Sequence, residues 1–140
     1  MIRIGPEPID LAAMIAAVSS PAHGAVCSFL GTTRETSPGD DRPVEALDYE
    51  AYVELATADF EAIAEEARTR WGPLEISIVH RTGRVALGEA SVAIAVGSPH
   101  RGAAFDACEF AINTLKAKAP IWKRETYRDG DTAWIANTPP

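Results

Sequence analysis

Residues 98–127, SPHRGAAFDACEFAINTLKAKAPIWKRETY, carry the change from helix to strand that decides the fold. Ser98 suits a helix N-cap and Pro99 the first helical position, so we predict a helix from here to Lys118. Over 121–127 the side chains alternate between the two sides of a strand. One side holds Ile121, Lys123, Glu125 and Tyr127, and the other holds Trp122, Arg124 and Thr126.

Hydrophobic patterns and turn residues predict the other elements on either side of this segment. Two further helices are expected over 11–18 and 55–71. Strands are expected over 2–4, 24–30, 44–52, 74–80, 91–96 and 132–136, with a loop over 35–43, a turn over 83–88 and a hairpin turn at Asp129-Gly130. These elements predict an α+β fold, with helices packed on a mostly antiparallel sheet with hairpins, in a single domain over residues 1–140.

The composition excludes several classes of function. The chain has 140 residues, a net charge of −7 and a pI near 4.9, which argues against general nucleic-acid binding. No segment is apolar enough to span a bilayer and the start shows no secretion signal, so we expect a cytoplasmic protein. Cys27 and Cys108 lack metal-binding spacing, and we expect two buried thiols, no disulfide framework and no metal site.

Positive charge gathers in residues 116–128 of this otherwise acidic chain. The segment carries a charge of +4, whereas the rest of the chain carries −11, so an anionic ligand is attracted to it. Helical spacing places Lys116 at the edge of an apolar surface and turns Lys118 about 200° away, toward solvent. Strand alternation gives Lys123 apolar neighbours on its own side. The spacing therefore predicts that Lys116 and Lys123 face a pocket.

Two lysines in a partly dry pocket lower each other's pKa, because burial and like charge both disfavour the ammonium form. One of them can then act as a base or nucleophile near neutral pH. Pairing of Glu125 with Lys123 opposes this shift. The alternative is that both lysines extend over hydrophobic surface with their amines in water, and the sequence leaves the two possibilities open.

A second candidate anion site lies at the predicted start of the last helix. Residues 98–101, SPHR, combine free backbone N–H groups with an imidazole and a guanidinium, which suits a phosphate or a carboxylate. A capped helix whose arginine meets a neighbouring carboxylate is equally compatible with these residues. Arg34 follows a buried strand and can reach over the end of a sheet. His80 is expected to have a structural role in a hairpin.

Several segments, in this order, resemble the MoaE family, the catalytic large subunits of molybdopterin synthase. The matching segments are GAV (24–26), FLGTTR (29–34), LDYEAY (47–52), HRTG (80–83), GE (88–89), SPHR (98–101), LK (115–116) and PIWKRE (120–125). A single segment carries little information, but the whole set in register is highly specific. One small departure is Thr32-Thr33, which stands where the family often has a valine before the arginine.

The resemblance implies an α/β-hammerhead fold and a sulfurtransferase of molybdenum cofactor biosynthesis that needs no cofactor. Such an enzyme installs the two dithiolene sulfurs of molybdopterin into cyclic pyranopterin monophosphate. The sulfur arrives as a thiocarboxylate on the C-terminal Gly-Gly of a small ubiquitin-like partner of the MoaD type. Two large subunits form a homodimer at the centre of a heterotetramer, and each pocket borrows residues across the dimer interface.

Position by position, the resemblance makes Lys116 and Lys123 catalytic. It gives Arg34, His100 and Arg101 roles in binding the pterin's phosphate or the partner's tail. Two other functions stay open on the sequence: a non-catalytic anion-binding or regulatory module that uses the same cationic pocket, and a purely structural dimer. The structural dimer leaves the expected clustering of Lys116, Lys123 and Arg101 unexplained.

Overall fold

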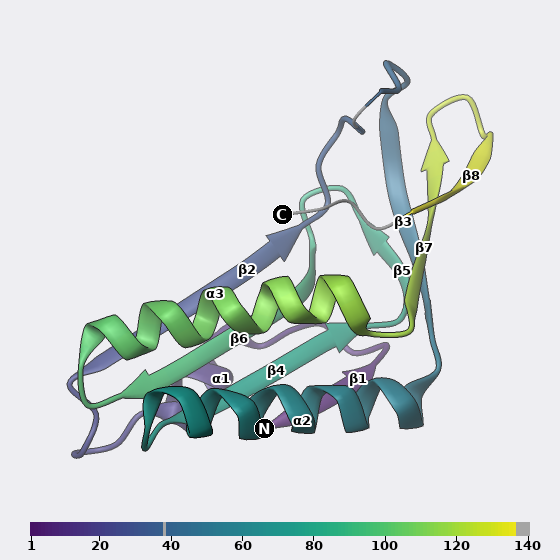
Figure 1. Ribbon diagram of the computed structural model, residues 1–140. Coiled ribbons are helices and arrows are strands. Elements are labelled where there is room, and N and C mark those ends of the chain that lie inside the picture. Colours follow the sequence, from purple (N-terminus) through teal and green to yellow (C-terminus); the bar gives the residue numbers. More distant parts are fainter. Residues whose placement is uncertain (38, 137–140) are drawn as a thin grey trace.

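The computed structural model describes residues 1–37 and 39–136 and folds them into two four-stranded sheets and three helices (Figure 1). The strands are β1 (Ile2–Gly5), β2 (Ala25–Thr32), β3 (Val44–Ala51), β4 (Glu75–Arg81), β5 (Gly83–Ala86), β6 (Ala90–Ser98), β7 (Ile121–Tyr127) and β8 (Thr132–Ile135). The helices are α1 (Leu11–Val18), α2 (Val53–Trp71) and α3 (Arg101–Lys118), and within the described residues none is long and apolar enough to cross a membrane. The α+β class predicted from the sequence is confirmed.

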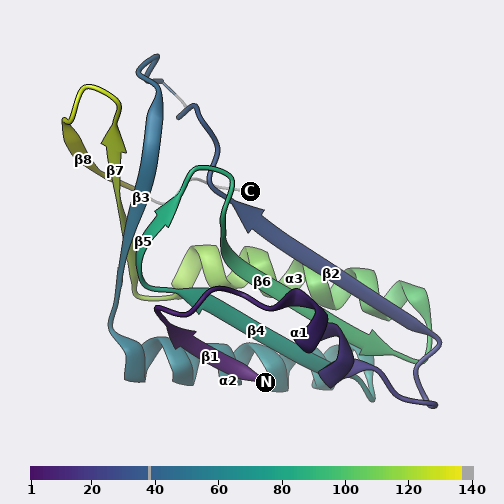
Figure 2. The same ribbon diagram turned by 180° about the vertical axis from the view of Figure 1, so that it is seen from behind.

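The first sheet has the strand order β1-β4-β6-β2, and α2 and α3 cover one of its faces while α1 covers the other (Figures 1 and 2). β1 runs parallel to β4, and the remaining pairs are antiparallel. Because β4 and β6 are covered on both faces, both appear in the sequence as nearly continuous apolar runs. Ile78 and Ile94 belong to the main core with α2 and α3, whereas Val79 and Ala93 pack with Met14 of α1.

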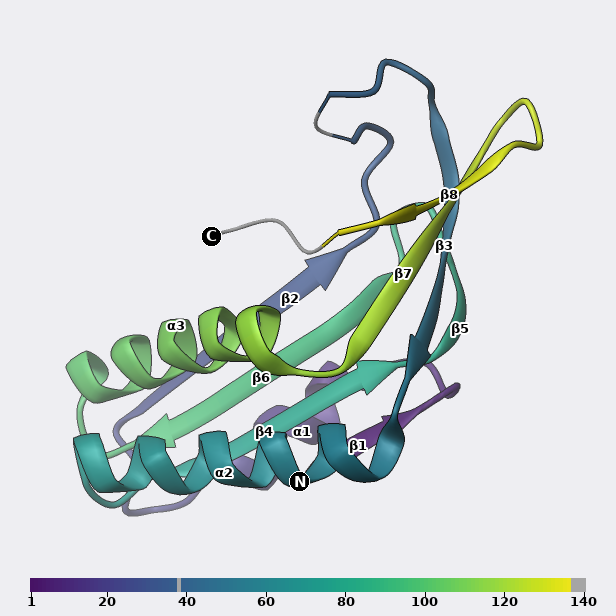
Figure 3. The same cartoon turned by 45° about the vertical axis from the view of Figure 1, so that its right-hand side comes forward.

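The second sheet has the order β5-β3-β7-β8 and rises from one end of the first sheet (Figures 1 and 3). All its pairs are antiparallel. The single sheet of the sequence prediction is therefore wrong, and the turn predicted over 83–88 is confined to residues 87–88. Residues 83–86 instead pair with β3, because Val85 is fully buried in the core and anchors this short strand. The predicted hairpin of β7 and β8 is confirmed, and Gly130 adopts a φ of 89° in its turn.

The start of α3 differs from the prediction. Ser98 is the last residue of β6 and pairs with Ala25 of β2, so its backbone stays extended. His100 is the N-cap, and no side-chain hydrogen bond caps the helix. The first residue of the helix is Arg101. The N-cap and the first helical residue therefore each lie two residues later than expected, although the end of the helix at Lys118 is as predicted.

The corner between α3 and β7 consists of Ala119 and Pro120 alone. The Ala119 carbonyl accepts a hydrogen bond of 2.8 Å from the Ile121 N–H, and the Pro120 carbonyl accepts one of 3.1 Å from the Tyr52 N–H. The second bond ties the corner to the residue that caps α2. The last turn of α3 and the first residues of β7 therefore have a fixed relative position.

The two cysteines are free thiols on neighbouring elements, Cys27 on β2 and Cys108 on α3. Cys108 is buried as expected, whereas Cys27 is only half-buried because β2 is the edge strand of its sheet. Burial, more than the nearby Cys27 thiol, raises the pKa of Cys108 to about 12. A thiol with this pKa is almost fully protonated at neutral pH and is a poor nucleophile.

Candidate active site

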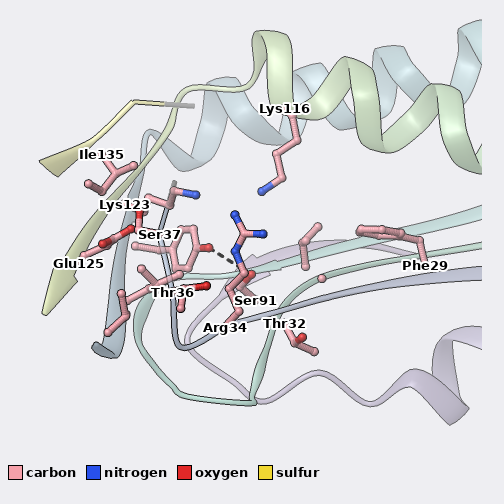
Figure 4. A pocket seen from close by; sticks show the side chains of 15 residues that line it. Phe29, Thr32, Arg34, Thr36, Ser37, Ser91, Lys116, Lys123, Glu125 and Ile135 are labelled. Atoms are coloured by element: carbon pink, nitrogen blue, oxygen red, sulfur yellow. Dashed lines mark hydrogen bonds between the residues drawn. The ribbon is translucent and has the colours of Figure 1, made fainter. Parts of the chain in front are cut away.

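A cavity of about 360 Å³ lies where the second sheet meets β2, β6 and the end of α3 (Figure 4). This volume lies in the range of small-molecule sites. Apolar side chains form part of its wall, and the charged side chains that line it are Arg34, Lys116, Lys123 and Glu125. Its lining residues extend from Phe29 to Ile135, so the site forms only when distant parts of the chain come together.

Lys116 and Lys123 enter this cavity from two different elements. Lys116 projects from the last turn of α3 and Lys123 from β7, and both side chains are half-buried, as the helical and strand spacing predicts (Figure 4). Burial and the charge of Lys123 lower the pKa of Lys116. Lys118, two residues after Lys116, is exposed and does not line the cavity. The lysine pair thus has the partly dry environment that favours neutral amines.

Glu125 is the carboxylate of the cavity and is only 4% exposed. Its Oε2 has no hydrogen-bond partner in the described part of the chain. Burial lowers the pKa of Lys123, the charge of Glu125 raises it, and the charge of Arg34 lowers it, in that order of size. The sequence left open whether burial or Glu125 determines the state of Lys123, and in the structure the net effect is a lowered pKa.

Arg34 lies just after β2 on the segment that leads to β3, and its side chain is exposed. In Figure 4 its guanidinium points toward the amine of Lys116 across the cavity. Three cationic groups, Arg34, Lys116 and Lys123, therefore face one space. Such a space attracts an anionic ligand, and a guanidinium can hold a phosphate or carboxylate with two parallel hydrogen bonds.

Tyr49, Ser91 and His80 also belong to the surroundings of the two lysines, although sequence reasoning gave none of them a part in the site. The Tyr49 hydroxyl donates a 3.2 Å hydrogen bond to Ser91 Oγ, and both side chains line the cavity. The Tyr49 ring meets the ring of His80 edge-on, with a centroid distance of 4.9 Å. Tyr49 lies opposite Lys123 in the pairing of β3 with β7. Only this strand pairing could have revealed Tyr49, and the sequence did not predict it.

His100 and Arg101 lie at the opposite end of α3 from Lys116. Both are exposed, and neither lines the cavity. Lys116 lies 15 positions after Arg101, which corresponds to about 22 Å along a helix axis. The expected cluster of Lys116, Lys123 and Arg101 is therefore wrong for a single copy of the chain.

Comparisons with known proteins agree with this fold. The model of the "MoaE protein" family matches residues 4–118. The chain is similar to the molybdopterin synthase catalytic subunit of Arabidopsis thaliana, with 45% identity over 130 residues, which cover 93% of this chain and 64% of the plant protein. The chain thus spans a little under two thirds of that relative.

Two solved structures share the fold of this chain. The crystal structure of molybdopterin synthase from Staphylococcus aureus has a TM-score of 0.89 and 36% identity, and the match covers 94% of each chain. A protein-protein complex of subunits 1 and 2 of molybdopterin-converting factor from Helicobacter pylori 26695 contains a chain that matches in fold, with a TM-score of 0.79 and 22% identity over 99% of this chain and 92% of that chain. The extent of these matches shows that the chain belongs to the MoaE family.

Proposed function

We propose that this chain is the catalytic subunit of a molybdopterin synthase, a sulfurtransferase of molybdenum cofactor biosynthesis, with residues 1–140 as its single domain. The observation that carries the proposal is the convergence of Lys116 and Lys123, both with lowered pKa, on a cavity of small-molecule size. The similarity to the Arabidopsis and Staphylococcus proteins supports the same activity.

The proposed substrate is cyclic pyranopterin monophosphate. Its phosphate suits the positive charge of Arg34, Lys116 and Lys123. Its flat ring suits the apolar part of the wall, which includes Phe29 and Leu47. The cavity thus offers one region for charge and one for a ring.

The proposed sulfur donor is the C-terminal thiocarboxylate of a small ubiquitin-like partner subunit that ends in Gly-Gly. The Helicobacter pylori structure, which shares the fold, is a complex of two subunits. A glycine tail has no side chains, so it can pass between the walls of a narrow cavity and bring its terminal group to the lysines. The amine of Lys116 or Lys123, in its ammonium form, binds the charged end of the tail.

Each transfer exchanges sulfur for oxygen and changes no oxidation state overall. The thiocarboxylate sulfur forms a C–S bond to a substrate carbon, and the oxygen on that carbon leaves as water. Water then cleaves the acyl C–S bond, which leaves a carboxylate on the tail and a thiol on the substrate. The protein has to supply protons and remove them, and a lysine pair that holds both an ammonium and a neutral amine can do both.

His100 and Arg101 enter the proposal through a second copy of the chain. Because they lie about 22 Å from Lys116 along α3, they cannot serve the cavity of their own copy. In the proposed homodimer, at the centre of a heterotetramer, they face the cavity of the neighbouring copy. There the exposed imidazole and guanidinium bind the substrate phosphate or the partner's tail.

A mass-spectrometric assay tests the proposed function. The full chain is mixed with cyclic pyranopterin monophosphate and thiocarboxylated partner, and we expect molybdopterin to form while the tail becomes a carboxylate. Tight binding of the pterin phosphate without product, in the presence of thiocarboxylated partner, would contradict the proposed enzymatic function and support a non-catalytic anion-binding module. The same assay with partner whose tail ends in a carboxylate, without the transferable sulfur, serves as the control.

A further inference from the structure

His80 of β4 lies beside Lys116 and Lys123, although β4 belongs to the first sheet. Its side chain is 1% exposed, and its ring contacts Tyr49 edge-on at 4.9 Å. Beside it lies a second, much smaller cavity of about 10 Å³. The residues around this small cavity are Tyr49, His80, Leu115, Lys116, Ala119, Ile121 and Lys123. Three of them, Tyr49, Lys116 and Lys123, also line the large cavity, so the two spaces share a wall.

The hydrogen bond of His80 defines which of its ring nitrogens carries the proton. Nδ1 lies 2.8 Å from the backbone carbonyl oxygen of Arg81. A carbonyl oxygen only accepts, so Nδ1 is the donor. Burial lowers the pKa of His80 to about 4, against the hydrogen bond to Arg81, which raises it, and the charges of Lys116 and Lys123 lower it further. The ring is therefore neutral near pH 7, and Nε2 is left with a lone pair that can only accept.

Amines and a phenol are the titratable groups that face this ring. They are Tyr49 from β3, Lys116 from α3 and Lys123 from β7. The strands on either side of β4 contribute apolar partners beside His80, Ile4 of β1 and Val92 of β6. Within the described residues, the hydrogen-bond donors for Nε2 thus come from the lysine side of the ring.

The small cavity offers about the minimum space that one buried water needs, and polar side chains border it, so a single water can occupy it. We propose that His80 is a positioning residue of the lysine site, whose unprotonated Nε2 accepts a hydrogen bond, through one buried water, from the ammonium form of Lys116 or Lys123. His80 thereby keeps one amine of the pair charged and oriented while the other is neutral. This role rests on the proposed function of Lys116 and Lys123 as a pair of one charged and one neutral amine, but not on the identity of the substrate.

The tautomer of His80 can be tested on the wild-type protein. Nitrogen chemical shifts of ¹⁵N-histidine-labelled full chain distinguish the Nδ1–H ring, the Nε2–H ring and the imidazolium. We expect His80 to remain a neutral Nδ1–H ring between about pH 5 and 8. An Nε2–H ring, or an imidazolium within this range, would overturn the proposal, because neither leaves a lone pair toward the lysines.

Three substitutions test the effect on the lysines. His80→Phe keeps a ring against Tyr49 but has no acceptor, whereas His80→Gln places a polar atom near Nε2 and His80→Asn places one near Nδ1. Competitive acetylation followed by peptide mass spectrometry gives the pH midpoint of each amine, with exposed Lys118 as the internal reference. We expect the midpoint of Lys116 or Lys123 to fall by about one pH unit in His80→Phe and His80→Asn, and by less than about 0.3 in His80→Gln.

Unchanged midpoints in all three variants would show that His80 only packs against Tyr49. If His80→Phe does not fold, the comparison of His80→Gln with His80→Asn still decides the question. His23→Asn is the matched control, because His23 Nδ1 also lies 2.7 Å from a backbone carbonyl, that of Val18, but the ring borders neither cavity. We expect no lysine midpoint to move in this control.

Acetylation needs no sulfur transfer, so the two proposals can fail separately. Shifted midpoints together with a wild-type chain that makes no product would keep the role of His80 in the lysine site and refute the proposed enzyme. Product formation with unshifted midpoints would refute the role of His80 alone.

Discussion

Lys116 and Lys123 reach one cavity from the two sides of a two-residue corner, Lys116 from α3 and Lys123 from β7. Backbone hydrogen bonds to the carbonyls of Ala119 and Pro120 fix this corner. Each amine therefore has its place before any ligand binds. Preorganisation of this kind lowers the cost of bringing reacting groups together.

Removal of either lysine should abolish most of the product formation. We expect Lys116→Ala and Lys123→Ala each to lower the rate at least about 100-fold, because proton transfer by a positioned group contributes that much or more. Single-turnover assays by mass spectrometry measure the rate. Lys118→Ala is the control, since this lysine is exposed and outside the cavity. Near wild-type rates in both active-site variants would refute the proposed catalytic pair.

The charge of Glu125 should determine part of the protonation of Lys123. Because this carboxylate raises the pKa of Lys123, we expect Glu125→Gln to make the Lys123 amine reactive at lower pH. Competitive acetylation against pH measures the shift, and Glu109→Gln, on the exposed surface of α3, serves as the control. A midpoint that moves to higher pH would contradict the role of Glu125.

Arg34 should contribute more to substrate affinity than to the rate of the chemical step. We expect Arg34→Ala to raise the Kd for the pterin phosphate by roughly 10- to 100-fold, and Arg34→Lys to have a smaller effect, because lysine keeps the charge but lacks the planar fork. Calorimetric titration measures Kd. Arg128→Ala should bind normally, since Arg128 pairs with Glu35 on the surface at 3.1 Å. Equal affinity of wild type and Arg34→Ala would exclude this contact.

Mixing two inactive variants should restore activity if the site is shared between copies. Lys116→Ala and Arg101→Ala carry their lesions at opposite ends of α3. In a dimer with one copy of each variant, one of the two cavities has both Lys116 and Arg101 intact. Half of the dimers formed by random reassociation of equal amounts are of this kind, so about a quarter of wild-type sites should be regained. Activity assays before and after exchange of subunits measure this gain. No recovery, with mixed dimers demonstrated by native mass spectrometry, would place Arg101 outside the neighbouring cavity.

The buried, neutral His80 should make the protein less stable in mild acid. Its pKa is about 4 in the folded chain and 6.5 ordinarily, so the unfolded chain binds a proton first as the pH falls. The free energy of unfolding should be undiminished above about pH 6.5 and fall by up to about 3 kcal/mol toward pH 4.

Urea denaturation across this range measures the loss of stability in acid. The loss should be absent from His80→Phe and present in His23→Asn. Hydrogen bonds to Arg42 lower the pKa of Asp40 from 3.8 to about 2, so the stability that this carboxylate contributes begins to fall only near pH 4, at the lower end of this range. An equal slope of stability against pH in His80→Phe and wild type would contradict the prediction.

The sequence predicted those features that depend on local spacing. The phases of Lys116, Lys118 and Lys123 follow from the 3.6-residue period of a helix and the two-residue period of a strand, and the structure agrees with all three. The two long buried strands of the first sheet were also predictable, because burial on both faces leaves an apolar run.

Features that depend on which strands pair could not be predicted in this way. The contact of Tyr49 with His80 requires the second sheet to dock against the first, and nothing in either local segment specifies that docking. The expected proximity of Arg101 to Lys116 was wrong for a different reason. It shares a helix with Lys116, but the length of that helix separates the two residues.

The corner at Ala119 and Pro120 also limits how the length of the chain can vary among related genes. Six residues lie between Lys116 and Lys123. An insertion or deletion of one residue there would turn every β7 side chain to the opposite face and replace Lys123 in the cavity with Trp122 or Arg124. Functional relatives should therefore align with this chain without gaps across 116–123, and a gap there would mark a homologue that has lost the reaction.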